Sequence, residues 1–190
     1  MRSPSRKPAT YEDLKAVPEH MMAQIIDGDL IVMPRPAAGH AKVTSEVGYE
    51  LIGPFGRGKG GPGGWLIFDE PELHLAADIL VPDLGAWRRE PAVLPATMPF
   101  FTVVPDWICE VLSPSTAVID RVKKARIYAR EGVHWKWTID PIGKTLEADE
   151  LRDGSWVSLG SWGPGEKPRV QPFDAIELEL DAWWDLIAPP

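Results

Sequence analysis

Short apolar runs separated by turns that contain Gly or Pro fill most of this 190-residue chain. This pattern constrains the fold more than any other feature, because such runs are typical of β-strands. Strands are predicted at residues 22–26, 30–33, 65–68, 72–75, 79–87, 106–112, 135–140, 145–151 and 155–159. Two of the turns contain Asp-Gly, at Asp27-Gly28 and Asp153-Gly154. Asp-Gly between apolar runs favours a hairpin, since Gly accepts the positive φ of a tight turn.

Two longer segments have the periodicity of helices. Residues 39–52 place Val43 and Leu51 on one apolar face, which predicts an amphipathic helix. Residues 116–131 follow a Ser-Pro-Ser segment and end at a glycine, which are start and stop signals of a helix. Together with the strands, these segments predict an α/β fold with a central mixed sheet flanked by helices.

The length and composition favour one domain. With 190 residues, of which 44% are hydrophobic and 25% charged, the chain is long enough for one full core. We expect a flexible N-terminal arm at residues 1–10 and a single domain at residues 11–190. Short helices are predicted at residues 11–17 and in the C-terminal LELDAWWDLI. The apolar side chains of that last segment form a packing or dimer face, namely Trp183, Trp184 and Ile187.

Several classes of protein are disfavoured by composition. No apolar run approaches the roughly 18 residues of a membrane span, and the N-terminus lacks the apolar core of a signal peptide. We therefore expect a cytoplasmic protein with no membrane contact. The single cysteine, Cys109, excludes an internal disulfide and is predicted to be a buried strand thiol. A net charge of −8 argues against indiscriminate nucleic-acid binding, although bound cations offset the charge of a carboxylate-lined metal site.

A glycine-rich segment at residues 53–64 imitates part of a phosphate-binding loop. Gly53, Gly58 and Lys59 match the start of the pattern GxxxxGK[ST], but Gly60 stands where the metal-binding hydroxyl belongs. A phosphate loop follows a strand and opens a helix, whereas this segment follows a predicted helix and leads to a predicted strand. We expect a surface loop and no ATP binding that depends on Lys59.

Two acidic residues interrupt apolar runs. Asp83 lies within ILVPDLGAW and Glu110 within WICEVL. A carboxylate in a buried strand is costly unless it is paired or binds a metal, and two such strands side by side would bring oxygen ligands for Mg²⁺ together. The alternative is that both acids mark strand ends and point to solvent, or pair with Arg88, Arg89 or Lys124.

The helix that follows Glu110 carries three polar residues on one face, because they are spaced by four. They are Asp120, Lys124 and Tyr128. Strand alternation places Leu112 on the same side as Glu110, so a lysine of the site must come from elsewhere. Lys124 is the natural donor, and Lys123 points about 100° away around the helix.

Four segments carry a resemblance to a known family: VPDLGAW, ICEVLSPST, DRVKKARIYAREGV and WTIDP. They resemble the Uma-two family of endonucleases, which belongs to the PD-(D/E)xK restriction-endonuclease-like superfamily. The resemblance extends from YEDLKAVPEH to LELDAWWDLI and so covers most of the chain. It implies a restriction-endonuclease-like fold, with a central mixed β-sheet flanked by helices and additional hairpin strands.

The resemblance also implies roles for individual residues. Asp83 and Glu110 would bind Mg²⁺ or Mn²⁺, and Lys124 would replace the lysine that is missing at position 112. Asp120 and Tyr128 would orient that lysine, although an Asp–Lys pair at this spacing is also an ordinary helix-stabilising contact. A further residue, His40, matches a histidine of the family. Its role stays open between the site and a structural one, as a helix cap or a hydrogen-bonded histidine.

Two positions depart from the family pattern. Gln24 stands where the family has glutamate, and Trp135 stands where it has an acid. Gln24 keeps the shape of glutamate without its charge, which is expected to reduce metal affinity or rate.

The implied function is Mg²⁺-dependent endonuclease activity that hydrolyses phosphodiester bonds of nucleic acid, with DNA as the expected substrate. The alternative is a catalytically inactive member of this fold that binds nucleic acid or protein, as a homodimer through its Trp-rich C-terminus.

Overall fold

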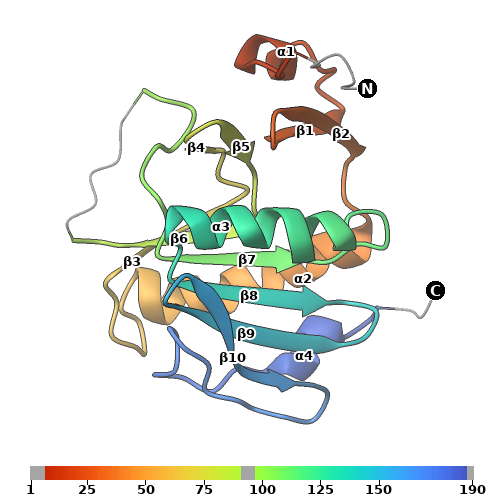
Figure 1. Ribbon diagram of the computed structural model, residues 1–190. Coiled ribbons are helices and arrows are strands. Elements are labelled where there is room, and N and C mark those ends of the chain that lie inside the picture. Colours follow the sequence, from red (N-terminus) through yellow and green to blue (C-terminus); the bar gives the residue numbers. More distant parts are fainter. Residues whose placement is uncertain (1–6, 91–96, 188–190) are drawn as a thin grey trace.

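The computed structural model describes residues 7–90 and 97–187, which form a mixed α/β structure with two sheets (Figure 1). The strands are β1 (Met21–Ile26), β2 (Asp29–Pro34), β3 (Trp65–Asp69), β4 (Leu73–Leu75), β5 (Asp78–Leu80), β6 (Leu84–Arg88), β7 (Trp107–Val111), β8 (Trp135–Asp140), β9 (Thr145–Arg152) and β10 (Ser155–Trp162). The helices are α1 (Tyr11–Lys15), α2 (Ala38–Leu51), α3 (Ala125–Glu131) and α4 (Leu180–Trp184), with π-helical turns η1 (Ile52–Gly56) and η2 (Ile119–Lys124).

The smaller sheet, sheet A, has the antiparallel order β2-β1-β5-β4. Its first two strands form the hairpin that the Asp-Gly signal predicts. Asp27 and Gly28 adopt φ values of 53° and 82° at the turn, and the register pairs Ile26 with Asp29. Left-handed backbone at both turn residues matches the twist of the strands, so this prediction is confirmed.

The larger sheet, sheet B, has the order β10-β9-β8-β7-β6-β3. Its pairs are antiparallel except β7 with β8, so the sheet is mixed. A parallel pair needs a crossover, and η2 with α3 provides it between the two central strands. Figure 1 shows α3 on one face of sheet B and α2 with α4 on the other, as predicted for a sheet flanked by helices.

The face of sheet B under α2 and α4 carries the main apolar core. Trp107 of β7 and Trp137 of β8 are fully buried there, and their rings meet edge to face at 5.2 Å. Cys109 lies in the same cluster, buried and unoxidised, as predicted. The C-terminal tryptophans complete this core, because Trp183 and Trp184 are 1% and 3% exposed. Their packing role is thus observed, whereas a dimer role stays a prediction.

The opposite face of sheet B lies under α3. Ile108 of β7 packs there with Ile127 of α3 and with Trp87 of β6. Trp156 of β10 packs on the same side and donates a hydrogen bond from Nε1 to the carbonyl of Ala125, at 2.8 Å. Side chains alternate along a strand, so the residues of β7 that do not face α2 must face α3, and Glu110 is one of them.

Three predicted boundaries differ from the structure. The predicted strand 79–87 is wrong as one element, because Pro82 lacks an N–H for a ladder and divides it into β5 of sheet A and β6 of sheet B. The helix expected at residues 116–131 begins in a turn and contains η2 before α3. The loop expected at residues 53–64 starts later, because η1 continues α2 through Gly56.

Two further expectations concern the ends of the chain and membranes. Residues 1–6 of the predicted arm lie outside the described residues. Beyond them, Ala9 donates a hydrogen bond to the carbonyl of Gly28, and Thr10 caps α1 through Asp13. In the described part of the chain, no helix has the length and apolarity that crossing a membrane requires.

Candidate active site

The two sheets are joined by a short crossover segment, Val81–Asp83, which organises the polar site. Its three residues leave sheet A after β5 and enter sheet B at β6. The carbonyl of Val81 accepts a hydrogen bond from Lys124 Nζ at 3.2 Å, and its N–H donates to Gln24 Oε1 at 2.9 Å. A residue of sheet A and a residue of η2 are therefore both bound to the backbone of Val81.

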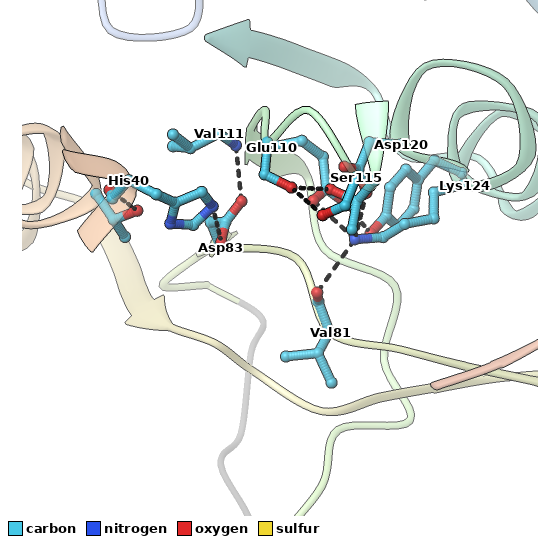
Figure 2. Close-up of polar contacts among 12 residues, drawn as sticks. His40, Val81, Asp83, Glu110, Val111, Ser115, Asp120 and Lys124 are labelled. Carbon is cyan, nitrogen blue, oxygen red and sulfur yellow. Dashed lines mark hydrogen bonds and ion pairs between the residues drawn. The ribbon is translucent and has the colours of Figure 1, made fainter. Parts of the chain in front are cut away.

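Asp83 ends the crossover segment and is held at both carboxylate oxygens. Oδ2 accepts the backbone N–H of Val111 at 2.7 Å, and Oδ1 lies 3.1 Å from His40 Nε2 (Figure 2). Its side chain is 13% exposed. Asp83 thus bridges the end of β7 to the first turn of α2, rather than interrupting a strand as predicted.

His40 faces Asp83 from α2. Burial lowers the pKa of His40, but the hydrogen bond and negative charge of Asp83 outweigh burial and raise the pKa above its ordinary value. Its other ring nitrogen, Nδ1, is buried without a hydrogen-bond partner among the described residues. His40 therefore contacts Asp83 through Nε2 and does not cap α2, which has no side-chain cap, and its role at the site stays a prediction.

Glu110 is the most enclosed acid of the site, at 3% exposed. Tyr128 donates its hydroxyl to Oε1 at 2.7 Å, and Lys124 Nζ lies 2.7 Å from Oε2. Lys124 also lies 3.3 Å from Asp120 Oδ1. The alternative in which Glu110 points to solvent is wrong, whereas the alternative in which it pairs with Lys124 describes the contact that the structure contains.

The helix after β7 delivers these partners on one face. Asp120, Lys124 and Tyr128 are all buried, while Lys123 is only half-buried. Asp120 and Lys124 belong to η2, whose backbone hydrogen bonds span five residues instead of four. Such π-helical turns are rare and are found frequently at functional sites.

The electrostatics of this cluster are dominated by burial and by an excess of acids. Burial raises the pKa of Glu110 to about 8, with Lys124 opposing the shift and Asp120 and Asp83 adding to it. Burial lowers the pKa of Lys124, but the charge of Glu110 outweighs burial, so the net shift is upward and the amine stays protonated. Burial also raises the pKa of Tyr128, which keeps its proton as a donor to Glu110.

A pocket of about 240 Å³ opens onto this cluster. It is lined by Asp83, Glu110, Asp120 and Lys124, and also by Gln24 and residues 33–37. Three hydroxyl groups at the start of the helix also reach it, those of Ser113, Ser115 and Thr116. Apart from Tyr128, which touches the site through Glu110, the site residues predicted from the sequence therefore line one cavity.

The donor atoms of this pocket suit a hard divalent cation. Mg²⁺ is usually bound in proteins by one or two carboxylates, several waters and substrate phosphate. Asp83 and Glu110 supply two such carboxylates, and each oxygen retains a lone pair beyond its present hydrogen bond. Within residues 7–90 and 97–187, no group of three or more His, Cys, Asp or Glu side chains is arranged to hold a metal. The fit is therefore to a cation that shares its shell with water and substrate.

Two predicted features lie away from this pocket. Trp135, at the start of β8, meets Trp65 at a centroid distance of 6.4 Å and does not line the pocket. The glycine-rich loop ends at β3 and opens no helix, so it lacks the geometry of a phosphate loop, and the expected absence of ATP binding stays a prediction. Sequence reasoning missed the backbone of Val81, although Pro82 signals a break in the strand.

Comparisons with known proteins agree with this architecture. The family model Uma2, described as "Putative restriction endonuclease", matches residues 8–182. A crystal structure from Anabaena variabilis, described as "a putative nuclease belonging to DUF820", is 20% identical with a TM-score of 0.74. The match covers 93% of this chain and 98% of that one, and it shows a shared fold. No curated protein matches the chain. Since the family model spans most of its length, the chain belongs to the Uma2 family.

Proposed function

We propose that this protein is a divalent-metal-dependent endonuclease of the restriction-endonuclease-like fold, which hydrolyses phosphodiester bonds of DNA. The observation that carries the proposal is the buried contact of Lys124 Nζ with Glu110 at 2.7 Å, in a pocket that Asp83 also lines. Folding alone gains little from a buried ion pair, because desolvation offsets much of its attraction. A catalytic role gives a reason for it, and membership of the Uma2 family supports that role.

Asp83 and Glu110 are the residues that would hold Mg²⁺ or Mn²⁺. When bound there, the cation lowers the pKa of a water molecule and neutralises charge on the scissile phosphate. The excess of acids over cations in the pocket favours such an ion, since three acids line it, Asp83, Glu110 and Asp120, against Lys124 and Arg35.

Side chains of the protein itself position the reacting groups. Lys124 holds its ammonium beside Glu110, where it orients the attacking water or offsets the developing negative charge. Tyr128 fixes the second oxygen of Glu110, and Asp120 fixes the lysine from the same helix face. The N–H of Val111 and the ring of His40 hold Asp83 in place.

The test is cleavage of supercoiled plasmid in the presence of Mn²⁺. We expect the wild type to nick the plasmid and Glu110→Gln, which keeps the shape of the side chain, to lose at least about a hundredfold in rate. Glu177→Ala removes an exposed acid outside the pocket and serves as the matched control with unchanged rate. Equal cleavage by Glu110→Gln would contradict the proposal.

A second candidate function is an inactive binding module for nucleic acid or protein, which the net charge of −8 and the neutral Gln24 favour. The response to divalent metal distinguishes these two functions. The endonuclease proposal expects Mn²⁺ to raise the melting temperature of the wild type and Asp83→Ala to abolish that rise. Equal rises in both proteins would favour the binding module.

A further inference from the structure

Gln24 of β1 has a carboxamide whose orientation is fixed by the crossover segment. The N–H of Val81 lies 2.9 Å from Oε1, and only the oxygen of a carboxamide accepts a hydrogen bond. The carbonyl end of the carboxamide is therefore the end turned to Val81. The side chain is 3% exposed and cannot rotate freely.

The amino end of the same carboxamide is left for the pocket. Among the described residues, Gln24 Nε2 has no hydrogen-bond partner, and it is not one of the side-chain atoms sealed from solvent. Gln24 lines the pocket and is otherwise buried, so the accessible surface of this nitrogen faces the cavity. The pocket wall thus presents two N–H donors at this position.

The wall around Gln24 contains no acid. It is built from β1, β2 and the segment that leads to α2, where Met22 and Met33 are cross-strand partners. Arg35, which also lines the pocket, adds a guanidinium that donates to the carbonyl of Glu19 at 3.0 Å. The pocket therefore offers hydrogen-bond donors from this segment as well as carboxylates from β7, η2 and the crossover segment.

We propose that Gln24 Nε2 binds a non-bridging phosphate oxygen of the substrate, so that β1 recognises the anion in the pocket that the carboxylates also line. This inference rests on the proposed function and names Gln24 as a residue that recognises the anionic substrate. A phosphodiester is complementary to a cavity that offers such donors, because its charged oxygens need hydrogen-bond donors where acids are also present. Glutamate at position 24 would place an acceptor there and add a negative charge to the wall.

The test is the affinity for a short single-stranded DNA oligonucleotide, measured by fluorescence anisotropy in EDTA. Gln24→Glu keeps an oxygen acceptor for Val81 and replaces the donor, so we expect its Kd to rise by about tenfold or more. Gln24→Met removes the donor without adding charge and is expected to raise the Kd by several-fold. Urea unfolding of each variant checks that the fold is retained.

The chain offers a matched control for charge. Its only other glutamine, Gln171, is exposed and outside the pocket, and Gln171→Glu adds the same charge. We expect this variant to bind like the wild type. Equal affinity of the wild type and both position-24 variants would overturn the inference, as would a loss in Gln24→Glu no larger than that in Gln171→Glu.

Failure of the inference differs from failure of the proposed function. If the wild type cleaves plasmid, Glu110→Gln does not, and Gln24→Glu binds DNA normally, the inference alone is wrong. If the wild type binds no oligonucleotide, the inference is also overturned, and the plasmid assay then judges the endonuclease proposal by itself.

Discussion

The two faces of sheet B differ in what they bury. Under α2 and α4, the side chains of β7 and β8 are apolar, and Trp107 and Trp137 pack around Phe173 at centroid distances of 5.0 and 5.6 Å. Under η2 and α3, the same two strands bury Glu110, Lys136 and Thr138. Alternation along the strands separates the two sets, since neighbours in sequence point to opposite faces.

This difference separates the stabilising part of the molecule from the chemically active part. Burial of apolar side chains stabilises the fold without hydrogen-bond partners, so the α2 face needs only close packing. Each buried polar group on the α3 face needs a partner, and Lys136 finds Thr138 and Asp149 at 3.1 and 2.6 Å. The stability of the α3 face therefore depends on pairing of its buried polar groups. The stability of the α2 face depends on how well apolar side chains fill its volume.

The largest expected effect is on the α2 face. Trp107→Ala removes a fully buried ring from between Trp137 and Phe173, and we expect a loss of roughly 3–5 kcal/mol in the free energy of unfolding. Urea unfolding measures it, and Val157→Ala on exposed β10 is the control. A loss below about 1 kcal/mol would contradict the assignment of the main core to this face.

The next prediction tests how far the α3 face depends on paired polar groups. Lys124→Met leaves the buried carboxylate of Glu110 without its cation, and we expect a loss of roughly 3 kcal/mol. Combining it with Glu110→Gln removes the unpaired charge and should regain at least about half of that loss. Urea unfolding of the single and double variants forms the cycle. Purely additive losses would show that the pair is not coupled.

The smallest effect is a pH dependence. The pKa of Glu110 is raised to about 8 in the folded state, above its ordinary value. Between the two values, the folded state binds more protons than the unfolded state, so stability falls as pH rises through this window. Glu110→Gln lacks this titration, and its stability should fall less than that of the wild type between about pH 5 and about pH 8, by roughly 1–3 kcal/mol.

The measurement is urea unfolding of both proteins in EDTA at the two pH values. His40 also has a raised pKa, and it contributes stability that is lost in the same direction, but it is present in both proteins. The difference between them therefore reports on Glu110. Parallel pH profiles would mean that Lys124 keeps Glu110 ionised throughout this range.

Much of the fold was predictable because local signals agreed with it. The Asp27-Gly28 turn, the periodicity of Val43 and Leu51 in α2, and the stop of α3 at Gly132 all depend on neighbouring residues alone. The predicted strand 79–87 failed because its apolar composition was given more weight than Pro82, although proline is confined to strand ends and edges.

The candidate site was predictable by residue but not by arrangement. Asp83, Glu110 and Lys124 are unusual in sequence because buried charge is costly, and the structure gathers them around one pocket. The roles of these residues stay predictions. The contacts of Val81 with Gln24 and Lys124 had no sequence signal, since backbone groups look alike at every position.

The sequence by itself determined which segments alternate, which turn and which carry charge within apolar runs, because these properties reside in neighbouring residues. Only the tertiary structure decided that the segment 81–83 passes between two sheets, and that the carboxamide oxygen of Gln24 accepts the N–H of Val81. Those outcomes depend on contacts between residues more than 50 positions apart, such as the 57-residue separation of Gln24 and Val81. The physical reason is that a side chain's partners are set by packing of whole elements, which local spacing does not encode.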